Sequence, residues 1–303
     1  MSAVKILHEI GKGAFSKCFL ALDNNNEYVA LKKSIYQEKY EGVRYSELRE
    51  IYCLLKLRIH PNIIPIKEFF FDNDKEINII FKYVSRTLKD FIHEFPLETR
   101  LTFFHQIIQQ LLSAIHFIHS NNIIHTDLKS SNILISKNRN KVKIYIIDFG
   151  SSQVEGVTER YSVVTTYPFR APEVFRYDNN YSYNIDIWSL GMVLYNYLFR
   201  KNYLEHRIFK EKTDAEKIQH IKYIDEDLEN NIKDEHTRFF IKKCLIFDEY
   251  KRPNIFELIN IYELLHNTTI KTINPNKINK NYDLDENIKK KLISFNLYIN
   301  NNL

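Results

Sequence analysis

Two short runs in the chain contain side chains that are suited to moving a phosphoryl group. The first run, HTDLKSSN, holds Asp127, Lys129 and Asn132, and the second, DFG, begins at Asp148. Asp127 can accept the proton of a hydroxyl group, and Lys129 can neutralise a phosphate. Asn132 and Asp148 offer the oxygen ligands that Mg²⁺ prefers. Together they supply what phosphoryl transfer from ATP needs, because that reaction depends mostly on positioning and charge stabilisation.

A glycine-containing turn near the start of the chain could cover the phosphates. Gly11 and Gly13 stand in IGKGAFSKC between two apolar runs, and glycine lets a backbone approach phosphate closely. Most G-x-G pairs are plain turns, and Ser16 stands where a third glycine would complete G-x-G-x-x-G. The run VALK that follows strengthens the phosphate-binding interpretation, because it places Lys32 in an apolar strand.

Lys32 requires a partner if it is buried, since an unpaired charge in an apolar strand is costly. The alternative is that Lys32 lies on an edge strand and points to solvent. Residues 43–58 show helical spacing of apolar positions and contain two acids, Glu47 and Glu50. We prefer Glu50 as the partner of Lys32.

The spacing of apolar runs predicts a small, mostly β lobe followed by a larger helical one. The expected strands and the single expected helix of the first lobe are 4–10, 15–22, 28–33, 43–58 (the helix), 63–71 and 77–84. In the second lobe, 101–120 is apolar almost all round, as in a buried helix. The remaining expected elements are a hairpin over 133–135 and 142–147, further helices after 183, and an amphipathic helix at 287–299.

Composition limits the class of protein further. The chain has 303 residues, of which 44% are hydrophobic and 27% charged, and its net charge is +5. This mild charge indicates solvated lysines rather than a nucleic-acid interface. Cys18, Cys53 and Cys244 are scattered, so we expect neither disulfides nor a zinc site, and a reducing compartment. The start of the chain shows no signal peptide and no run reaches membrane-spanning length, which predicts an intracellular, cytoplasmic or nuclear protein.

These motifs, in this order, resemble those of eukaryotic protein kinases. The likeness runs from Ile10 to Pro253 and includes APE at 171–173, DIWSLG at 186–191 and a late Arg252-Pro253 pair. The resemblance implies an α+β, two-lobed protein-kinase fold, with a five-stranded antiparallel sheet and one helix in the small lobe. It also implies a kinase domain over 1–265, an N-lobe over 1–83, a C-lobe over 84–265, and an Asn/Lys-rich extension over 266–303.

The resemblance also assigns roles to individual residues. It implies that Asp127, Lys129, Lys32 and Glu50 are catalytic and that Asn132 and Asp148 bind Mg²⁺. It further implies that Arg252 pairs with Glu173, and that Asp186 anchors a hydrophobic spine formed by Leu54, Ile66, His125 and Phe149. The residues that it assigns to ATP binding are Ile10, Gly11, Lys12, Gly13, Ala14, Phe15, Ser16, Cys18, Ala30, Lys32, Phe81, Tyr83 and Val84.

Substrate class follows from two further matches to the family. Lys129 and Thr166 stand where serine/threonine kinases place the lysine and threonine that meet the catalytic aspartate. The runs HTD, DFGS and VTTYPFRAPE resemble those of LAMMER and SR-protein kinases, which allows dual specificity. The stretch from Asp186 to Arg252 is shorter than in the cyclin-dependent and MAP kinase group to which those kinases belong, and Ser131 replaces a glutamate of that group.

The same resemblance leads to expectations about regulation and partners. Many regulated kinases have an arginine before the catalytic aspartate, which pairs with a phosphate on the activation segment. Thr126 stands there instead, so we expect activity without phosphorylation of that segment. We also expect protein substrates, a monomer, and neither nucleic-acid nor membrane partners.

Two other functional classes compete with an active kinase. A catalytically weak or dead kinase-fold scaffold would bind protein partners only, and losses at Lys32, Asp127 or Asp148 would favour it; none is lost. A small-molecule kinase is the third class. The complete activation segment through APE, with Arg252 as its partner, argues against that class because these parts dock peptides.

Overall fold

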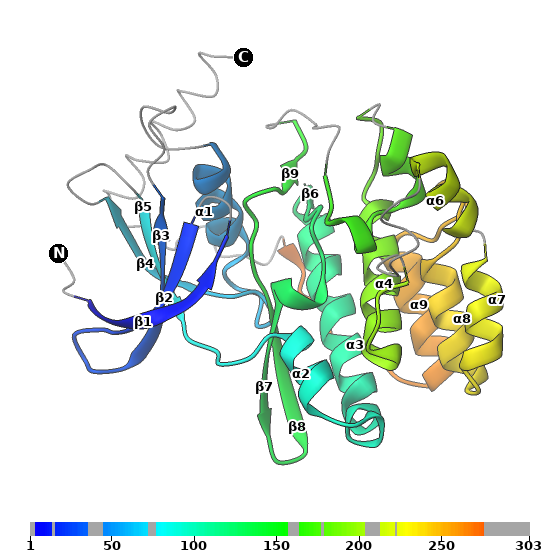
Figure 1. Cartoon of the computed structure of the whole chain (residues 1–303), viewed down its shortest axis with the longest axis horizontal. Helices are drawn as coiled ribbons and strands as arrows, with labels where there is room; N and C mark the ends of the chain where they lie inside the picture. Colours follow the sequence, from blue (N-terminus) through cyan, green and yellow to red (C-terminus); the bar gives the residue numbers. More distant parts are fainter. Residues whose placement is uncertain are drawn as a thin grey trace.

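The chain folds into a β-rich lobe and a helical lobe joined by a short linker (Figure 1). The computed structural model describes residues 4–13, 16–35, 45–71, 77–156, 164–176, 179–203, 213–221 and 223–275. Ala14 and Phe15 of the glycine-containing turn lie outside the described residues, as does the helix expected at 287–299. The arrangement confirms the predicted two-lobed α+β architecture.

The N-terminal lobe is built on a five-stranded antiparallel sheet with the order β1-β2-β3-β5-β4. Apolar residues alternate along its strands, because successive side chains of a strand point to opposite faces. On β5, Ile77 and Ile79 join the main core on the α1 side, whereas Ile80 packs with Val29 and Leu31 on the other face. The strands are β1 (Lys5–Lys12), β2 (Ser16–Leu22), β3 (Tyr28–Ser34), β4 (Ile66–Phe71) and β5 (Ile77–Lys82).

One helix, α1 (Tyr45–Leu57), packs against this sheet. Its apolar face buries Leu54 and Leu57 completely. The same face turns Glu50 inward, so that only 3% of this residue is exposed. The orientation of α1 therefore decides where the Glu50 carboxylate lies.

The predicted strand at 63–71 is wrong at its beginning, because β4 starts only at Ile66. Ile63 instead forms an isolated parallel bridge with Ile146 of the other lobe, and Ile64 N donates to Ile146 O at 3.1 Å. The apolar run 63–71 therefore has two parts. Its first residues connect the lobes, and its remainder forms β4.

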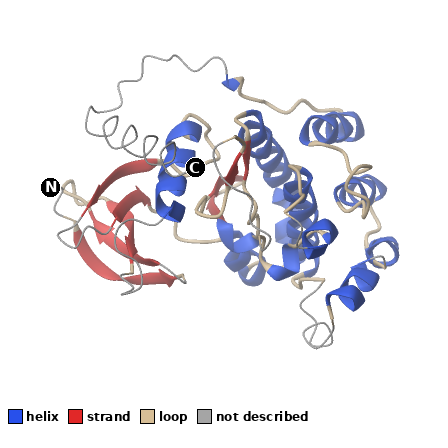
Figure 2. Cartoon of the chain, turned by 90° about the horizontal axis from the view of Figure 1, so that it is seen from above, coloured by secondary structure: helices blue, strands red, loops and turns tan. Residues whose placement is uncertain are grey.

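The C-terminal lobe surrounds α3, which is buried along most of its length (Figures 1 and 2). Its apolar circumference agrees with the expectation for residues 101–120, although the helix begins earlier. Among the described helices, none has both the length and the apolar character needed to cross a bilayer. The helices are α2 (Leu88–Glu94), α3 (Leu97–Ser120), α4 (Asn184–Phe199), α6 (Asp214–Ile221), α7 (Ile224–Asn231), α8 (Glu235–Cys244) and α9 (Ile255–His266).

Short strands and turns carry the polar motifs between these helices. Two small antiparallel pairs, β6–β9 and β7–β8, place the segment 125–132 beside the segment that follows Asp148. The short elements are β6 (Ile123–Ile124), η1 (Ser130–Asn132), β7 (Ile133–Asn138), β8 (Lys141–Ile146), β9 (Gln153–Val154), η2 (Tyr167–Phe169) and η3 (Pro172–Arg176).

A buried ion pair holds η3 against the base of the lobe. The Arg252 guanidinium donates to both oxygens of Glu173 at 2.7 and 3.1 Å and stacks on Trp188, 5.1 Å from the ring centroid. Neither charged side chain is more than 2% exposed. This is the pair that the resemblance implied, and removing one partner would leave a buried charge uncompensated, which costs about 3–5 kcal/mol.

Candidate active site

The predicted ATP-binding residues meet in one cleft of about 670 Å³ between the lobes. Its lining residues come mostly from strands of the N-terminal lobe and from the loops and strands of the C-terminal lobe, the two parts that Figure 2 shows side by side. All of those residues that the structure describes line this cleft, as do Glu50, Asn132 and Asp148. They are Ile10, Gly11, Lys12, Gly13, Ser16, Cys18, Ala30, Lys32, Phe81, Tyr83 and Val84.

Lys32 is the central cation of the cleft. Its Nζ donates to both oxygens of Glu50, at 2.8 and 2.7 Å, and to Oδ1 of Asp148 at 3.3 Å. Of the two acids considered on α1, the structure therefore pairs Lys32 with Glu50, while Glu47 accepts from Ser34 on β3. Burial alone would lower the pKa of Lys32, but the two carboxylates outweigh it and raise that pKa well above its ordinary value.

Asp148 joins this cluster from the C-terminal lobe. Burial acts to raise its pKa, yet the charge of Lys32, helped by His125, outweighs burial and holds the pKa below its ordinary value. Asp148 has φ +65°, a left-handed conformation that is uncommon for a residue with a side chain. The turn at the start of DFG thus presents an ionised carboxylate next to Lys32.

Asp127 lies in a dense polar cluster formed by the catalytic loop and the activation segment. Its Oδ2 accepts from Lys129 Nζ at 2.6 Å and from Asn132 Nδ2 at 3.0 Å. Its Oδ1 accepts from the hydroxyl and backbone N–H of Thr166, at 2.6 and 2.9 Å. Lys129 Nζ also donates to Thr166 Oγ1 at 2.7 Å, which closes the cluster. The structure therefore brings together the residues that the sequence proposed for hydroxyl activation and substrate class.

Asp186, at the start of α4, holds the backbone of this loop. Its carboxylate accepts from the backbone N–H groups of His125, at 2.8 Å, and Thr126, at 3.0 Å, and from His119 Nε2 at 2.9 Å. His125 in turn accepts the Asp127 N–H at 3.2 Å and packs edge-on against Phe149. The buried carboxylate of Asp186 on α4 therefore helps to fix the position of Asp127, because it binds the backbone of the two preceding residues.

Thr126 links the catalytic loop to the residues after DFG. Its backbone has φ +66°, and its hydroxyl donates to Ser151 O at 2.9 Å. On the α1 side, Arg49 donates to Gly150 O at 3.3 Å. The consecutive carbonyls of Gly150, the last residue of DFG, and Ser151 are therefore both bound by protein side chains.

The donors at the cleft floor fit a hard divalent cation. Asn132 turns its Nδ2 toward Asp127, donating to the backbone oxygen at 2.9 Å, so its Oδ1 points elsewhere. Asp148 keeps nearly half of its side chain exposed beside it, and both residues line the same cleft. A carboxylate and an amide oxygen are ligands that suit Mg²⁺.

Some functional contacts were not predicted from the sequence. Lys82, the last residue of β5, donates to Tyr145 OH at 2.9 Å and lies over the Tyr145 ring. The contact of His119 Nε2 with Asp186 Oδ2 at 2.9 Å is another case. Both depend on elements far apart in the chain, and no local spacing signals them.

Removing the cation of the cluster should make stability depend on pH. In Lys32→Met the buried carboxylate of Glu50 and the half-exposed carboxylate of Asp148 lose their partner. The pKa of Glu50 in the folded state then rises further above its value in the unfolded chain, and the lowering of the Asp148 pKa is lost. The variant then binds a proton on folding, and its free energy of unfolding should fall by about 1–3 kcal/mol from pH 5 to pH 8.

The free energy of unfolding of the wild-type protein should vary less over that window, because the charge of Lys32 opposes the rise that burial gives to the pKa of Glu50. Asp148 has a lowered pKa in the folded state, so its contribution is present above 3.8 and is lost only at lower pH. Lys32 has a raised pKa, so its contribution is present below 10.5 and is lost only at higher pH. Urea unfolding at both pH values measures the difference, with the exposed Lys141→Met as control. If Lys32→Met lowered the free energy of unfolding equally at the two pH values, Glu50 and Asp148 would not gain the expected pH dependence.

Comparison with known proteins places this geometry in a family. A family model described as a protein kinase domain matches residues 4–262. Curated relatives include a probable serine/threonine-protein kinase, glkA, from Dictyostelium discoideum (31% identical, 84% of this chain, 57% of the relative). Others are a CTD kinase subunit alpha from Saccharomyces cerevisiae (32%, 70% and 39%) and a cyclin-dependent kinase 1 from Encephalitozoon cuniculi (33%, 62% and 64%).

The chain spans between 39% and 64% of the length of these relatives. Among solved structures, a chain of the CAK complex from Chaetomium thermophilum bound to ATP-γ-S shares the fold. Its TM-score is 0.73 at 22% identity, covering 90% of this chain and 94% of the other. The predicted resemblance to protein kinases is confirmed: this chain belongs to the protein kinase domain family.

Proposed function

We propose that this protein is an ATP- and Mg²⁺-dependent serine/threonine protein kinase. It would transfer the γ-phosphoryl group of ATP to serine and threonine hydroxyls of protein substrates. One arrangement carries the proposal. Lys32 bridges Glu50 and Asp148 in the cleft, and Asp127, which lies with Lys129 and Thr166, is bonded to Asn132 of the cleft lining. Family membership and the names of the relatives support it.

Each group in the cleft has a role that its contacts support. Lys32, held by Glu50, would bind the α- and β-phosphates, and Gly11, Gly13 and the Ser16 backbone would cover the triphosphate. Phe81 borders the adenine end, where the backbone of Tyr83 and Val84 offers hydrogen-bonding groups. These assignments use the charge and position of side chains that already line one cleft.

Asp127 is placed to orient the acceptor hydroxyl and take its proton. Lys129, 2.6 Å from it, would neutralise charge that develops on the transferred group. A magnesium ion held by Asn132 and Asp148 would supply further neutralisation of the phosphates. Thr166, which donates to Oδ1 of Asp127 and accepts from Lys129, favours the serine/threonine class, and the LAMMER-like motifs suggest dual specificity.

The scaffold alternative is less well supported. A protein that only binds partners has no need to keep a buried lysine paired with two carboxylates, because buried ion pairs add little to stability by themselves. The kinase and extension boundaries at 265 and 266, the LAMMER likeness, the monomeric state and the intracellular location stay predictions.

A direct assay tests the proposal. The purified protein is incubated with labelled ATP, Mg²⁺ and a library of peptides, and the products are hydrolysed for phosphoamino-acid analysis. We expect phosphoserine and phosphothreonine. Mainly phosphotyrosine on the added peptides would overturn the substrate class, and no transfer at all would favour the scaffold.

Three substitutions should abolish transfer without unfolding the protein. Lys32→Ala, Asp127→Asn and Asp148→Ala each remove a charged group in the cleft, which commonly costs a factor of ~10² or more. Asp148→Ala should weaken Mg–ATP binding more than Asp127→Asn does. Circular dichroism serves as the folding control. Near wild-type rates in all three variants would show that the enzyme proposal is wrong.

We also propose that the residue after the phosphorylated one is preferentially proline. Thr166 contacts Asp127, so its neighbour Thr165 borders the acceptor position. Thr165 has φ +67°, and its carbonyl accepts from the Arg170 guanidinium at 3.0 Å. That carbonyl is therefore already engaged, and a substrate backbone N–H facing it would lose its water partner without a replacement. Proline has no N–H to lose.

Matched peptides that differ only in proline or alanine after the serine test this preference. We expect kcat/KM to be about tenfold higher for proline, which corresponds to about 1.4 kcal/mol. Arg170→Met frees the Thr165 carbonyl and should shrink that ratio. Equal use of both peptides by the wild-type protein would contradict the proposal.

Activity should not require phosphorylation of the activation segment. Thr126 and Arg49 already bind two consecutive carbonyls, of which the first belongs to the last residue of DFG, and Thr126 offers no charge for a phosphate. Phosphatase-treated protein should keep its activity, as should a variant with Thr158, Ser162 and Thr165 changed to Ala and Tyr161 to Phe. All of these except Thr165 lie outside the described part of the chain. A drop of more than about tenfold would show that phosphorylation drives activation.

A further inference from the structure

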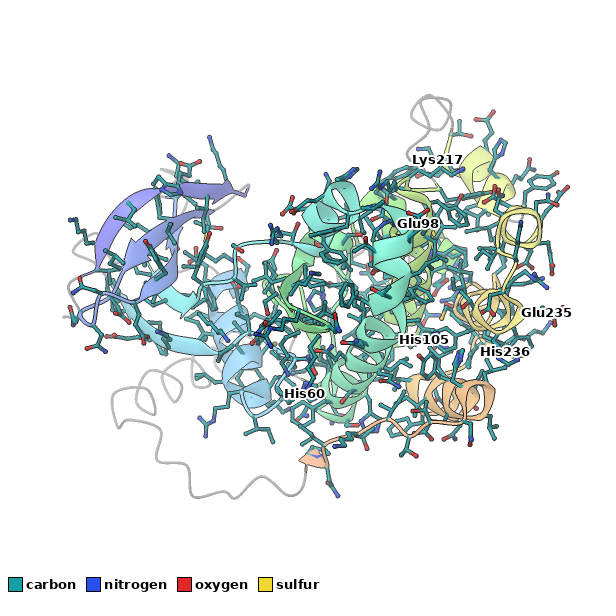
Figure 3. All side chains as sticks on the ribbon, turned by 90° about the horizontal axis from the view of Figure 1, so that it is seen from below. His60, Glu98, His105, Lys217, Glu235 and His236 are labelled. Atoms are coloured by element: carbon teal, nitrogen blue, oxygen red, sulfur yellow. The ribbon has the colours of Figure 1, made fainter. Side chains whose placement is uncertain are left out.

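The chain that follows α9 is packed against the C-terminal lobe, although the family match ends before it, at residue 262. We call residues 267–275 the C-terminal strap. Ile270 is 5% exposed, and its N–H donates to Glu263 Oε1 at 2.6 Å. Thr268 Oγ1 accepts from Gln109 Nε2 at 3.3 Å. Figure 3 shows the strap running from α9 along α3 toward the labelled His60.

A hydrogen-bonded relay connects the strap to the loop between α1 and β4. Ser113, on α3, donates its hydroxyl to the Lys271 carbonyl at 2.6 Å. His60 Nε2 lies 3.1 Å from the same hydroxyl, and His60 Nδ1 accepts the Asn62 N–H at 3.2 Å. Because Nδ1 accepts, the ring proton is on Nε2 and points to Ser113. The hydrogen bonds therefore all point the same way: Asn62 donates to His60, His60 to Ser113, and Ser113 to Lys271.

The relay is buried and keeps this direction at neutral pH. His60 is 1% exposed and Ser113 is 7% exposed. Burial, with smaller effects from the charges of Lys143 and His116, lowers the pKa of His60 to about 4. The ring also stacks on Phe117, with centroids 5.2 Å apart. Breaking one link would leave buried polar groups unpaired, which is costly.

The loop at the far end of the relay holds the chain that leads to Asp148. Asn62 donates its side chain to Ile144 O at 2.9 Å, and its carbonyl accepts from Ile146 N at 2.8 Å. Ile64 N donates to Ile146 O at 3.1 Å. The same loop follows α1, which carries Glu50. Both acids that flank Lys32 thus lie on segments that this loop fastens.

We propose that the C-terminal strap acts through Ser113 and His60 to position the Lys32 cluster. Ser113 and His60 are then positioning residues: they touch no substrate, and they fix the α1–β4 loop and the end of β8. The kinetic part of this inference rests on the proposed kinase function. The structural part does not, because it concerns the backbone of the loop itself.

The test compares two variants of the full chain that each remove one hydroxyl from the contacts of the strap. Ser113→Ala breaks the relay, whereas Thr268→Val removes a strap contact outside it and is the matched control. Amide hydrogen exchange is followed at Ile64 and Ile146, neither of which is bonded to Ser113. We expect exchange about tenfold faster in Ser113→Ala, equivalent to about 1.4 kcal/mol of local opening, and unchanged exchange in Thr268→Val and in α4.

Kinetics give a second readout. Ser113→Ala should lower kcat several-fold with the peptide KM unchanged, and Ser113→Thr, which keeps the hydroxyl, should restore it. If Ser113→Ala does not fold, His60→Asn decides the matter: it keeps an acceptor for the Asn62 N–H and loses the donor to Ser113, so Ile64 and Ile146 should again exchange faster.

Unchanged exchange at Ile64 and Ile146 in the folded relay variant would overturn the inference. An equal effect of Thr268→Val would overturn it too, because the strap would then act by general packing. An inactive wild-type protein would overturn the proposed function alone, and the exchange measurement would still decide the role of the strap.

Discussion

The buried carboxylate of Asp186 is the contact on which the active-site geometry depends. It takes three donors at 2.8–3.0 Å: two successive backbone N–H groups of the catalytic loop and the ring of His119. Thr126 of this loop has a left-handed backbone, which is unfavourable for a residue with a side chain. The bonds to Asp186 stabilise the loop in this conformation. Asp186 lies on α4 within the core and so transfers the rigidity of the helical lobe to Asp127.

The second constraint joins the lobes. Lys32 comes from the sheet, Glu50 from α1 and Asp148 from the helical lobe, so one cation connects three separately held segments. One positive charge, on Lys32, faces two negative charges, on Glu50 and Asp148. This excess of negative charge suits a site that binds a further cation. Lys82 with Tyr145, and Ile64 with Ile146, fasten the lobes at two other points. The cleft geometry therefore results from several small contacts around one strong one.

Much of this was predictable from the sequence, for identifiable reasons. Strands and helices follow from apolar periodicity. The helix at 43–58 offered two acids on similar faces as partners of Lys32, and the preferred one, Glu50, is the partner in the structure. The beginning of β4 was not predictable, because Ile63 and Ile64 read as strand yet pair with Ile146 of the other lobe. Tyr145, His60 and Ser113 carry no local signal either. Their roles arise where segments distant in the chain meet, and a single sequence has no periodicity that reports such meetings.

The position of the C-terminal strap changes how the end of the domain is understood. Asn- and Lys-rich composition suggested an extension with few core positions, yet Ile270 is buried and Ile273 packs on the core. Two apolar residues in a polar run are enough to dock a segment when its backbone also finds partners, as the Lys271 carbonyl does at Ser113. Docking of this kind fixes the strap in register. A register error of one residue would bring a different carbonyl to Ser113 and turn Ile270 away from the core, so apolar burial and the relay specify the same alignment.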